Sequence, residues 1–269
     1  MSYQVWLDSL SIGQIFIVFV LGGAVIGECG YRVGRWWQFR TPGNKEGPTQ
    51  MLVGSLLGLL AFLLAVTMGM ASDRFDTRRG MIVTEANMIG TVYLRAGFLP
   101  DAEAAKSRSL LREYAPLRVL SDQPRDVPQR IARSLELHQE LWTIAETLAH
   151  SMPESVVLSL YIDALNEMID IHESRVTAGI YGRLPATIFI LLLISSVLTL
   201  SMVGYSAGLT GRRSPPTAIV MIVVLGAVIT LLVDLDRGHG GLITINQQPL
   251  IDLQQSMGVD IGSTPRQGD

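Results

Sequence analysis

The segment Met70–Arg79, MASDRFDTRR, places aspartate and arginine side chains directly after a long uncharged segment. Charges of both signs recur in Val233–Gly238, VDLDRG, and arginines stand at two positions before the third apolar segment. We call these residues the charged cluster: Asp73, Arg74, Asp76, Arg78, Arg79, Arg175, Arg183, Asp234, Asp236 and Arg237. They can form interfacial ion pairs, each worth roughly 0–1 kcal/mol when exposed. Alternatively, they can concentrate ions at a pore mouth, because low-dielectric walls focus their field.

A second pattern lies in the uncharged segment that precedes this cluster. Small residues recur at spacings of four and three from Gly54 to Ser72, which puts them on one face of a helix. With Phe62 at its edge, this face is the small-residue stripe: Gly54, Gly58, Ala61, Phe62, Ala65, Gly69 and Ser72. In lipid such a face allows helices to pack closely. The same face could instead line a conduit with Phe62 as an apolar constriction, and an oligomer could combine both.

Four further polar residues stand where the sequence is otherwise apolar or rich in glycine. Glu85 and Asn87 lie on a predicted helix whose other residues resemble a core, so we expect hydrogen bonds between helices rather than a ligand site. Gln247 and Gln248 follow a glycine-rich segment. We interpret that segment as a turn that returns the chain to the membrane surface.

The sequence lacks the patterns of enzymes and metal sites. His138, His150, His172 and His239 are scattered, without the spacing of a zinc site on a helix. The single cysteine, Cys29, excludes an intramolecular disulfide and a cysteine metal cluster. Nucleophile-elbow, phosphate-loop and dinucleotide motifs are missing as well, and the net charge of −3 is too small to indicate nucleic acid. We therefore predict a protein that is not an enzyme and has no cofactor or metal.

The elements that must position these residues are apolar helices. The mean hydropathy is +0.35 and only 17% of the residues are charged. Apolar blocks near residues 12–28, 51–72, 185–205 and 216–233 are long enough, or nearly so, to cross a hydrocarbon layer of roughly 30 Å. The polar middle of the chain has helical periodicity. The predicted fold is all-α: a polytopic membrane protein with four transmembrane helices and an extramembrane helical bundle between spans two and three.

The predicted organisation has four parts. Residues 1–72 form a first transmembrane hairpin, 73–183 the extramembrane helical domain, 184–234 a second hairpin and 235–269 a membrane-adjacent tail. Within the helical domain, Pro100–Asp101 ends the helix that continues from the second span, and the aspartate can cap the next helix.

The short hinges between paired spans carry most of the basic residues outside the helical domain. These residues are Arg32, Arg35, Arg40, Lys45, Arg212 and Arg213. The positive-inside rule therefore predicts that the hinges are cytoplasmic and that the helical domain lies outside.

Several short segments, in this order, resemble a bacterial membrane family of undetermined function that is catalogued as bestrophin-like. The segments are Ser72–Arg79, Glu85–Asn87, Gly204–Gly208, Asp234–Arg237 and Gln247–Leu250. The resemblance covers most of the chain. It implies a homo-oligomeric, pentameric ion channel whose second span lines the pore. It also implies a cytoplasmic helical domain, which conflicts with the orientation predicted from the hinges.

We therefore predict an oligomeric, channel-like protein of the bacterial inner membrane, with the second span near the pore. Its partners would be the lipid bilayer, other copies of the chain and inorganic ions. The alternative is a non-conducting membrane sensor or scaffold whose helical domain binds a ligand or partner.

Overall fold

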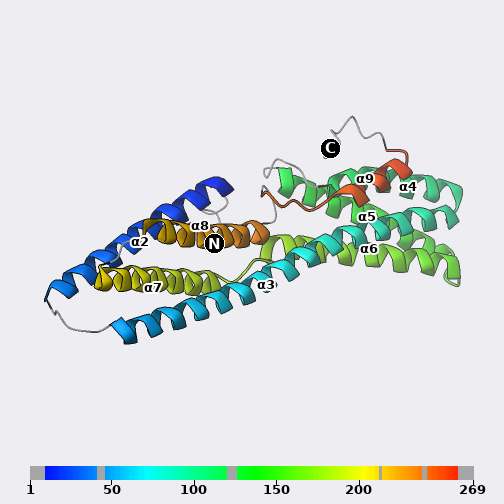
Figure 1. Cartoon of the computed structure of the whole chain (residues 1–269). Helices are drawn as coiled ribbons and strands as arrows, with labels where there is room; N and C mark the ends of the chain where they lie inside the picture. The colour runs from blue at the N-terminus through cyan, green and yellow to red at the C-terminus, as the bar shows by residue number, and fades with distance from the viewer. Residues whose placement is uncertain (1–9, 41–45, 120–125, 212–213, 238–240, 260–269) are drawn as a thin grey trace. The chain divides into compact units, whose positions relative to one another are not determined.

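The computed structural model describes residues 10–40, 46–119, 126–211, 214–237 and 241–259, and these residues form helices and no strand. The helices are α2 (Ile12–Arg40), α3 (Glu46–Arg95), the 3-10 helix η1 (Ala96–Phe98), α4 (Asp101–Arg118), α5 (Val127–Ser151), α6 (Val156–Tyr181), α7 (Ala186–Thr210), α8 (Pro215–Asp236) and α9 (Gln248–Ser256) (Figure 1). The predicted all-α fold is confirmed. Three residues of the predicted hinges, Lys45, Arg212 and Arg213, lie outside the described residues.

The chain forms two compact units, which we describe separately. The membrane unit comprises Met1–Phe75 and Arg183–Thr244, and the bundle unit comprises Asp76–Gly182 and Ile245–Asp269. Residues after the fourth span are therefore divided between both units.

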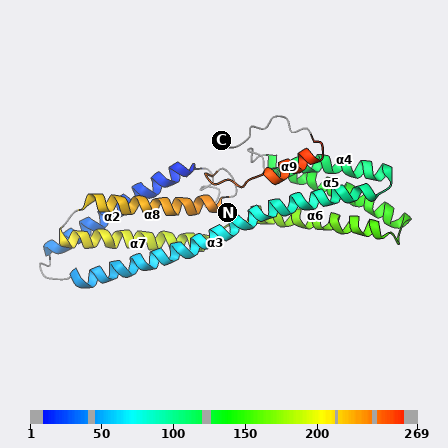
Figure 2. The same ribbon diagram turned by 45° about the vertical axis from the view of Figure 1, so that its right-hand side comes forward.

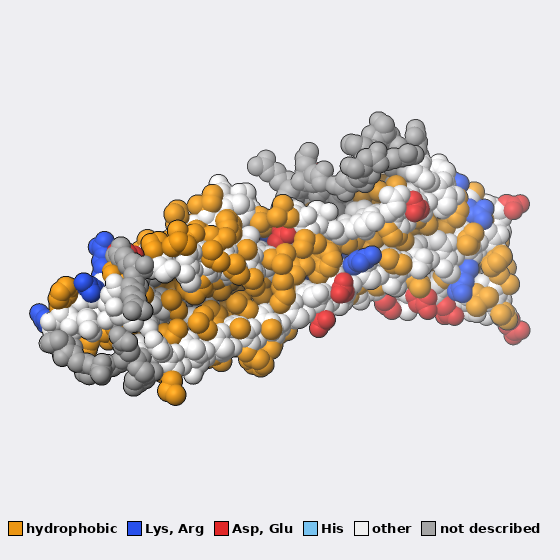
Figure 3. Space-filling view, in the orientation of Figure 1, with side chains coloured by type: hydrophobic (Ala, Val, Ile, Leu, Met, Phe, Trp, Pro, Cys, Tyr) orange, Lys and Arg blue, Asp and Glu red, His pale blue; other side chains and the backbone are white. Residues whose placement is uncertain are grey.

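Four of the described helices, α2, α3, α7 and α8, are long and apolar enough to cross a membrane. Hydrophobic side chains cover much of the surface of the membrane unit, as expected for contact with lipid (Figure 3). Helix α2 continues past its apolar block because its polar end is stabilised locally. Glu28 accepts a hydrogen bond from Arg32 at 2.9 Å, and the Arg40 guanidinium lies 4.1 Å from the centre of the Trp36 ring.

Glycines allow α2 and α7 to approach closely within the membrane unit. A Cβ atom on Gly30 or Gly34 would collide with backbone carbonyl groups of α7. A Cβ atom on Gly204 or Gly208 would collide with the backbone of α2. We call these four residues the glycine seam. They form two GxxxG motifs whose lack of side chains brings the two backbones into contact.

The membrane half of α3 packs differently, through apolar side chains. Leu63, Leu64 and Ala71 belong to a hydrophobic cluster that also contains Leu192 of α7 and Leu232 of α8. This contact buries one face of α3 and leaves its other face exposed in the part of the chain that the structure describes.

The bundle unit has a separate hydrophobic core between the last part of α3 and helices α4, α5, α6 and α9 (Figure 2). Leu111, Leu137, Leu141 and Leu165 are fully buried there. Each helix turns an apolar stripe inward, as the helical periodicity predicts.

Two details of the bundle unit differ from the sequence analysis. Asp101 was expected to cap α4, but Pro100 occupies the cap position and Asp101 lies in the first helical turn. There its carboxylate still interacts favourably with the helix dipole. Helix α9 was not predicted. Its Leu250 is fully buried in the bundle core, so this part of the tail packs on protein.

Candidate functional site

The small-residue stripe is exposed along its whole length in the single chain. Each of its seven residues is exposed, and Phe62 retains 64% of its accessible surface. A Cβ atom added at Gly54, Gly58 or Gly69 would meet nothing within 4 Å in the described part of the chain. The opposite face of α3 supplies the buried Leu60, so α3 is packed on one side only.

The charged cluster is divided between the two units. In the membrane unit, acidic residues at the end of α8 hold backbone N–H groups. Asp236 Oδ1 accepts from Leu184 at 2.7 Å, and the carboxylate of Asp234 accepts from Leu242 and Ile243, each at 2.9 Å. Both aspartates are buried. They therefore fix the start of α7 and the segment after α8, which is a structural role.

The arginines of the membrane unit make comparable contacts. Arg74 donates to the backbone carbonyl of Arg183, and Arg237 donates to that of Leu10 at 2.9 Å. Asp73, which also belongs to this unit, is exposed. These contacts join side chains to backbone groups, so they differ from the ion pairs of the interfacial interpretation, which stays a prediction.

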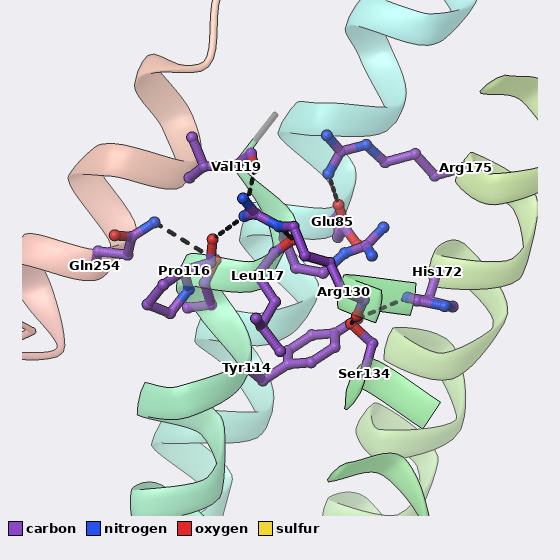
Figure 4. Close-up of polar contacts among 12 residues, drawn as sticks. Glu85, Tyr114, Pro116, Leu117, Val119, Arg130, Ser134, His172, Arg175 and Gln254 are labelled. Carbon is purple, nitrogen blue, oxygen red and sulfur yellow. Dashed lines mark hydrogen bonds and ion pairs between the residues drawn. The ribbon is translucent and has the colours of Figure 1, made fainter. Parts of the chain in front are cut away.

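The remaining members of the charged cluster belong to the bundle unit. Asp76 and Arg79 are exposed, whereas Arg78 is buried. Arg175 lies on α6 and donates to Glu85 Oε2, so it takes part in the core of the bundle (Figure 4).

Glu85 is the centre of a buried ionic network. Its side chain is 0% exposed, and its second oxygen, Oε1, accepts from Arg118 Nε at 2.6 Å. The three residues Glu85, Arg118 and Arg175 form the polar core, which joins α3, α4 and α6. The predicted hydrogen bonds between helices are thus present at Glu85. Two guanidinium groups share one carboxylate, which leaves an excess of positive charge inside the bundle.

Arg130 closes the end of α4 beside the polar core. It donates to the backbone carbonyl groups of Pro116 at 2.5 Å, Leu117 at 3.1 Å and Val119 at 2.7 Å (Figure 4). These carbonyls belong to the last turn of a helix and its cap, where they lack partners within the helix. Burial, and then the nearby Arg118 charge, lower the pKa of Arg130.

An aromatic and imidazole cluster lies next to these arginines. The Tyr114 hydroxyl is 3.2 Å from His172 Nδ1, and the Tyr114 and His138 ring centres are 5.0 Å apart. Tyr114 is fully buried, and burial raises the pKa of its hydroxyl. In the described ranges, no group of three or more histidine, cysteine, aspartate and glutamate side chains has an arrangement that could hold a metal ion.

A family model described as the bestrophin-like domain matches residues 32–250. The chain belongs to the bestrophin-like family. The matched region contains the small-residue stripe, the whole charged cluster and the polar core. The bestrophin-like assignment made from short segments of sequence is therefore confirmed.

The fold agrees with that of a bestrophin homologue of known structure. A crystal structure of a mutant bacterial bestrophin homologue from Klebsiella pneumoniae is similar with a TM-score of 0.63, covering 90% of this chain and 97% of that chain. The sequence identity is 12%, so this likeness concerns the fold. A search of curated proteins found no match.

The remaining polar positions lie outside the polar core of this bestrophin-like chain. Asn87 is exposed on α3, so the prediction that it faces a helical core was wrong: only Glu85 turns inward. Gln247 donates to the Ile245 carbonyl at 3.1 Å, and Gln248 donates to Asp252 at 2.7 Å along α9. Gln247 stands at the cap of α9 and Gln248 in its first turn, where the sequence analysis expected only a turn.

Sequence reasoning did not predict that the bundle unit brings together Tyr114, Arg118, His138 and His172. Each lies on an amphipathic helix at a position that faces the core. A polar residue at a core-facing position of a helical period was the available signal.

Proposed function

We propose that this bestrophin-like chain forms a homo-oligomeric ion channel in the bacterial inner membrane, with α3 at the central contact. The observation that carries the proposal is the exposed small-residue stripe. Family membership supports it, because the bestrophin-like resemblance implies an oligomeric channel whose second span lines the pore.

Glycine on the outside of a helix needs an explanation. Each glycine destabilises a helix interior by about 1 kcal/mol relative to alanine. A face that meets only lipid gains nothing in return, and leucine would serve there equally well. Gly54, Gly58 and Gly69 are useful if another copy of α3 approaches them closely, or if they widen a conduit.

Phe62 is the large member of the stripe and lies within its length. In an assembly with α3 at the centre, its ring would narrow the conduit as an apolar constriction. The acidic Asp76 follows one turn after the stripe ends and is exposed, so it can contribute to ion preference at one mouth.

The experiment is conductance of purified protein in planar bilayers. We expect Phe62→Ala to change the single-channel conductance by about twofold or more, because it removes the constriction. Leu59→Ala is the matched control, since Leu59 is exposed on the same helix outside the stripe. Asp76→Asn should shift the reversal potential under a salt gradient. A silent bilayer with folded oligomer would contradict the proposal.

The role of the stripe in assembly has its own test. Gly58→Leu should lower the oligomeric mass measured in detergent, whereas Gly13→Leu should leave it unchanged. Both glycines have open space around them in the described chain, but only Gly58 belongs to the stripe. A protein that is monomeric and silent would favour the sensor or scaffold alternative.

We further propose that the bundle unit lies outside the membrane on the non-cytoplasmic side. The support is the concentration of arginine in the short hinges. In a Cys29→Ala background, cysteine placed at the exposed Glu146 should react with an impermeant thiol reagent in intact spheroplasts. Reaction only after lysis would place the bundle unit in the cytoplasm.

A further inference from the structure

Two histidines form a closely packed pair in the core of the bundle unit. His138 comes from α5 and His172 from α6, and their ring centres are 4.7 Å apart in an edge-on arrangement. Their exposed fractions are 5% and 0%. Figure 4 shows the Tyr114 hydroxyl directed at His172. We call His138 and His172 the histidine pair.

The histidine pair is poorly satisfied as a set of hydrogen-bonding groups. Within the described ranges, both ring nitrogens of His138 and Nε2 of His172 are buried without a hydrogen-bond partner. Burying an unpaired polar atom destabilises a folded protein. A phenyl ring has a similar shape and would carry no such penalty, so the choice of histidine at both positions requires another reason.

The charges around the histidine pair oppose its protonation. The charged and titratable groups around it come from two other helices and from α6 itself: Glu85 on α3, Tyr114 and Arg118 on α4, and Glu173 and Arg175 on α6. Glu173 is exposed, and Glu85 is already shared between the two arginines of the polar core. A positive imidazolium would therefore enter a buried region that already has excess positive charge.

The effect on the pKa values follows from this arrangement. Burial, and then the Arg118 charge, lower the pKa of His138 to about 4. Burial and Arg118, with smaller contributions from His138 and Arg175, lower the pKa of His172 to about 3. The hydroxyl of Tyr114 stays protonated because burial raises its pKa. At neutral pH Tyr114, His138 and His172 are therefore uncharged.

We propose that the histidine pair is an acid-responsive switch: protonation of either ring separates α5 and α6 from α4 and opens the core of the bundle unit. The proposal does not depend on ion conduction. The proposal explains why histidines with unpaired ring nitrogens stand at two core positions. If the positions had only a structural role, apolar side chains would be more stable there.

The direction of the response follows from proton linkage. In an opened bundle a histidine has its ordinary pKa near 6.5, so the open state binds protons at a higher pH than the closed state. Above pH 6.5 both histidines are neutral in either state, and the closed bundle has its full stability. The closed bundle loses stability as the pH falls from 6.5 toward the closed-state pKa, because only the open state takes up protons in that range. At pH 5 one histidine with a closed-state pKa of about 4 favours opening by about 30-fold.

The test is hydrogen–deuterium exchange of the full-length protein in detergent at pH 7.5, 6.5 and 5.0. The double variant His138→Phe/His172→Phe is compared with the wild type at each pH, so that the intrinsic pH dependence of exchange cancels. Relative to pH 7.5, opening of α4, α5 and α6 in the wild type should rise at least about 30-fold over the double variant at pH 5. His150→Phe is the matched control, because His150 is exposed on α5.

Three results would overturn the proposal. The first is a double variant that opens at pH 5 as much as the wild type. The second is protection by zinc ions at pH 7.5 that requires the histidine pair, which would make it a metal site. The third result comes from NMR of the wild-type imidazole signals, which also tests the proposal if the double variant does not fold. Titration of both rings near pH 6.5 with the bundle closed would refute the switch, and titration that begins only as the amides of α4, α5 and α6 lose protection would support it.

Discussion

Replacing Glu85 by glutamine should destabilise the bundle unit strongly while keeping the shape of the side chain. Glu85 is fully buried and accepts from both Arg118 and Arg175. Removing one partner from a buried ion pair costs about 3–5 kcal/mol, because a buried charge is left without compensation. Here two guanidinium groups would share that loss. We expect Glu85→Gln to reduce the free energy of opening of the bundle unit by about 3–5 kcal/mol.

Hydrogen–deuterium exchange at pH 7.5 measures this free energy directly for the amides of α4 and α6. The matched control is Glu113→Gln. Glu113 accepts from Arg133 at 2.7 Å, but both side chains are substantially exposed, so the pair is screened by water. The control should cost no more than about 1 kcal/mol. The two variants are compared by how much each lowers the free energy of opening. The difference measures how much burial adds to the cost of losing an ion pair.

A triple variant separates the loss of charge from the loss of volume. Glu85→Leu with Arg118→Met and Arg175→Met replaces the polar core by apolar side chains, which is often neutral or stabilising for buried ion pairs. We expect the triple variant to recover most of the stability lost in Glu85→Gln. The reasoning would be refuted if Glu85→Gln cost as little as Glu113→Gln, or if the triple variant were as unstable as Glu85→Gln.

Other contacts give smaller or more local effects. Gly34→Leu should force α2 and α7 apart and lower the thermal unfolding midpoint in detergent by several degrees. Gly13→Leu is the control and should leave the midpoint unchanged. Equal midpoints of the two variants would exclude close contact at the glycine seam. Asp236→Ala removes the carboxylate that accepts from the Leu184 N–H group before α7, so the free energy of unfolding should fall by about 1–3 kcal/mol. An unchanged free energy of unfolding would show that water replaces the carboxylate. Arg130→Met removes donors from the end of α4, so exchange should accelerate in its last turn and stay unchanged in α9.

The spans could be predicted from the sequence because hydropathy is a local property. Each apolar block is continuous, and its length alone matches a hydrocarbon layer. The continuation of the second span into the bundle, as α3, followed from an uninterrupted helical pattern up to Pro100. Helix ends outside the apolar blocks, such as that of α2, depended on polar contacts that hydropathy does not describe.

The polar core could be predicted only in part, because its partners are distant in the sequence. Glu85 was recognised as a polar residue on a core-like helix, but Arg118 and Arg175 lie 33 and 90 residues away. Many arginines of an amphipathic helix face water, and local sequence does not show which one turns inward. His138 and His172 are also distant from each other in the sequence. Local patterns therefore did not show that the two rings meet in the core.

The glycine patterns illustrate a different limit. Gly54 and Gly58 of the small-residue stripe form a GxxxG motif, as Gly30 and Gly34 do, and the structure uses only the second of these two motifs for contact within the described residues. The two motifs are equivalent as patterns. Only the fold tells which one meets a helix of the same chain and which one is left open.

The glycine seam also restricts how the membrane unit can move. Its glycines are spaced four residues apart on both α2 and α7, so sliding one helix along the other by less than a turn would drive a side chain into the opposing backbone. The two helices should therefore move only as one rigid body. Helix α3 is held in the same unit by apolar side chains and by the hydrogen bond from Arg74 to the Arg183 carbonyl, and its glycines Gly54, Gly58 and Gly69 meet no backbone in the described residues. Rotation or translation within the membrane unit should thus be carried mainly by α3.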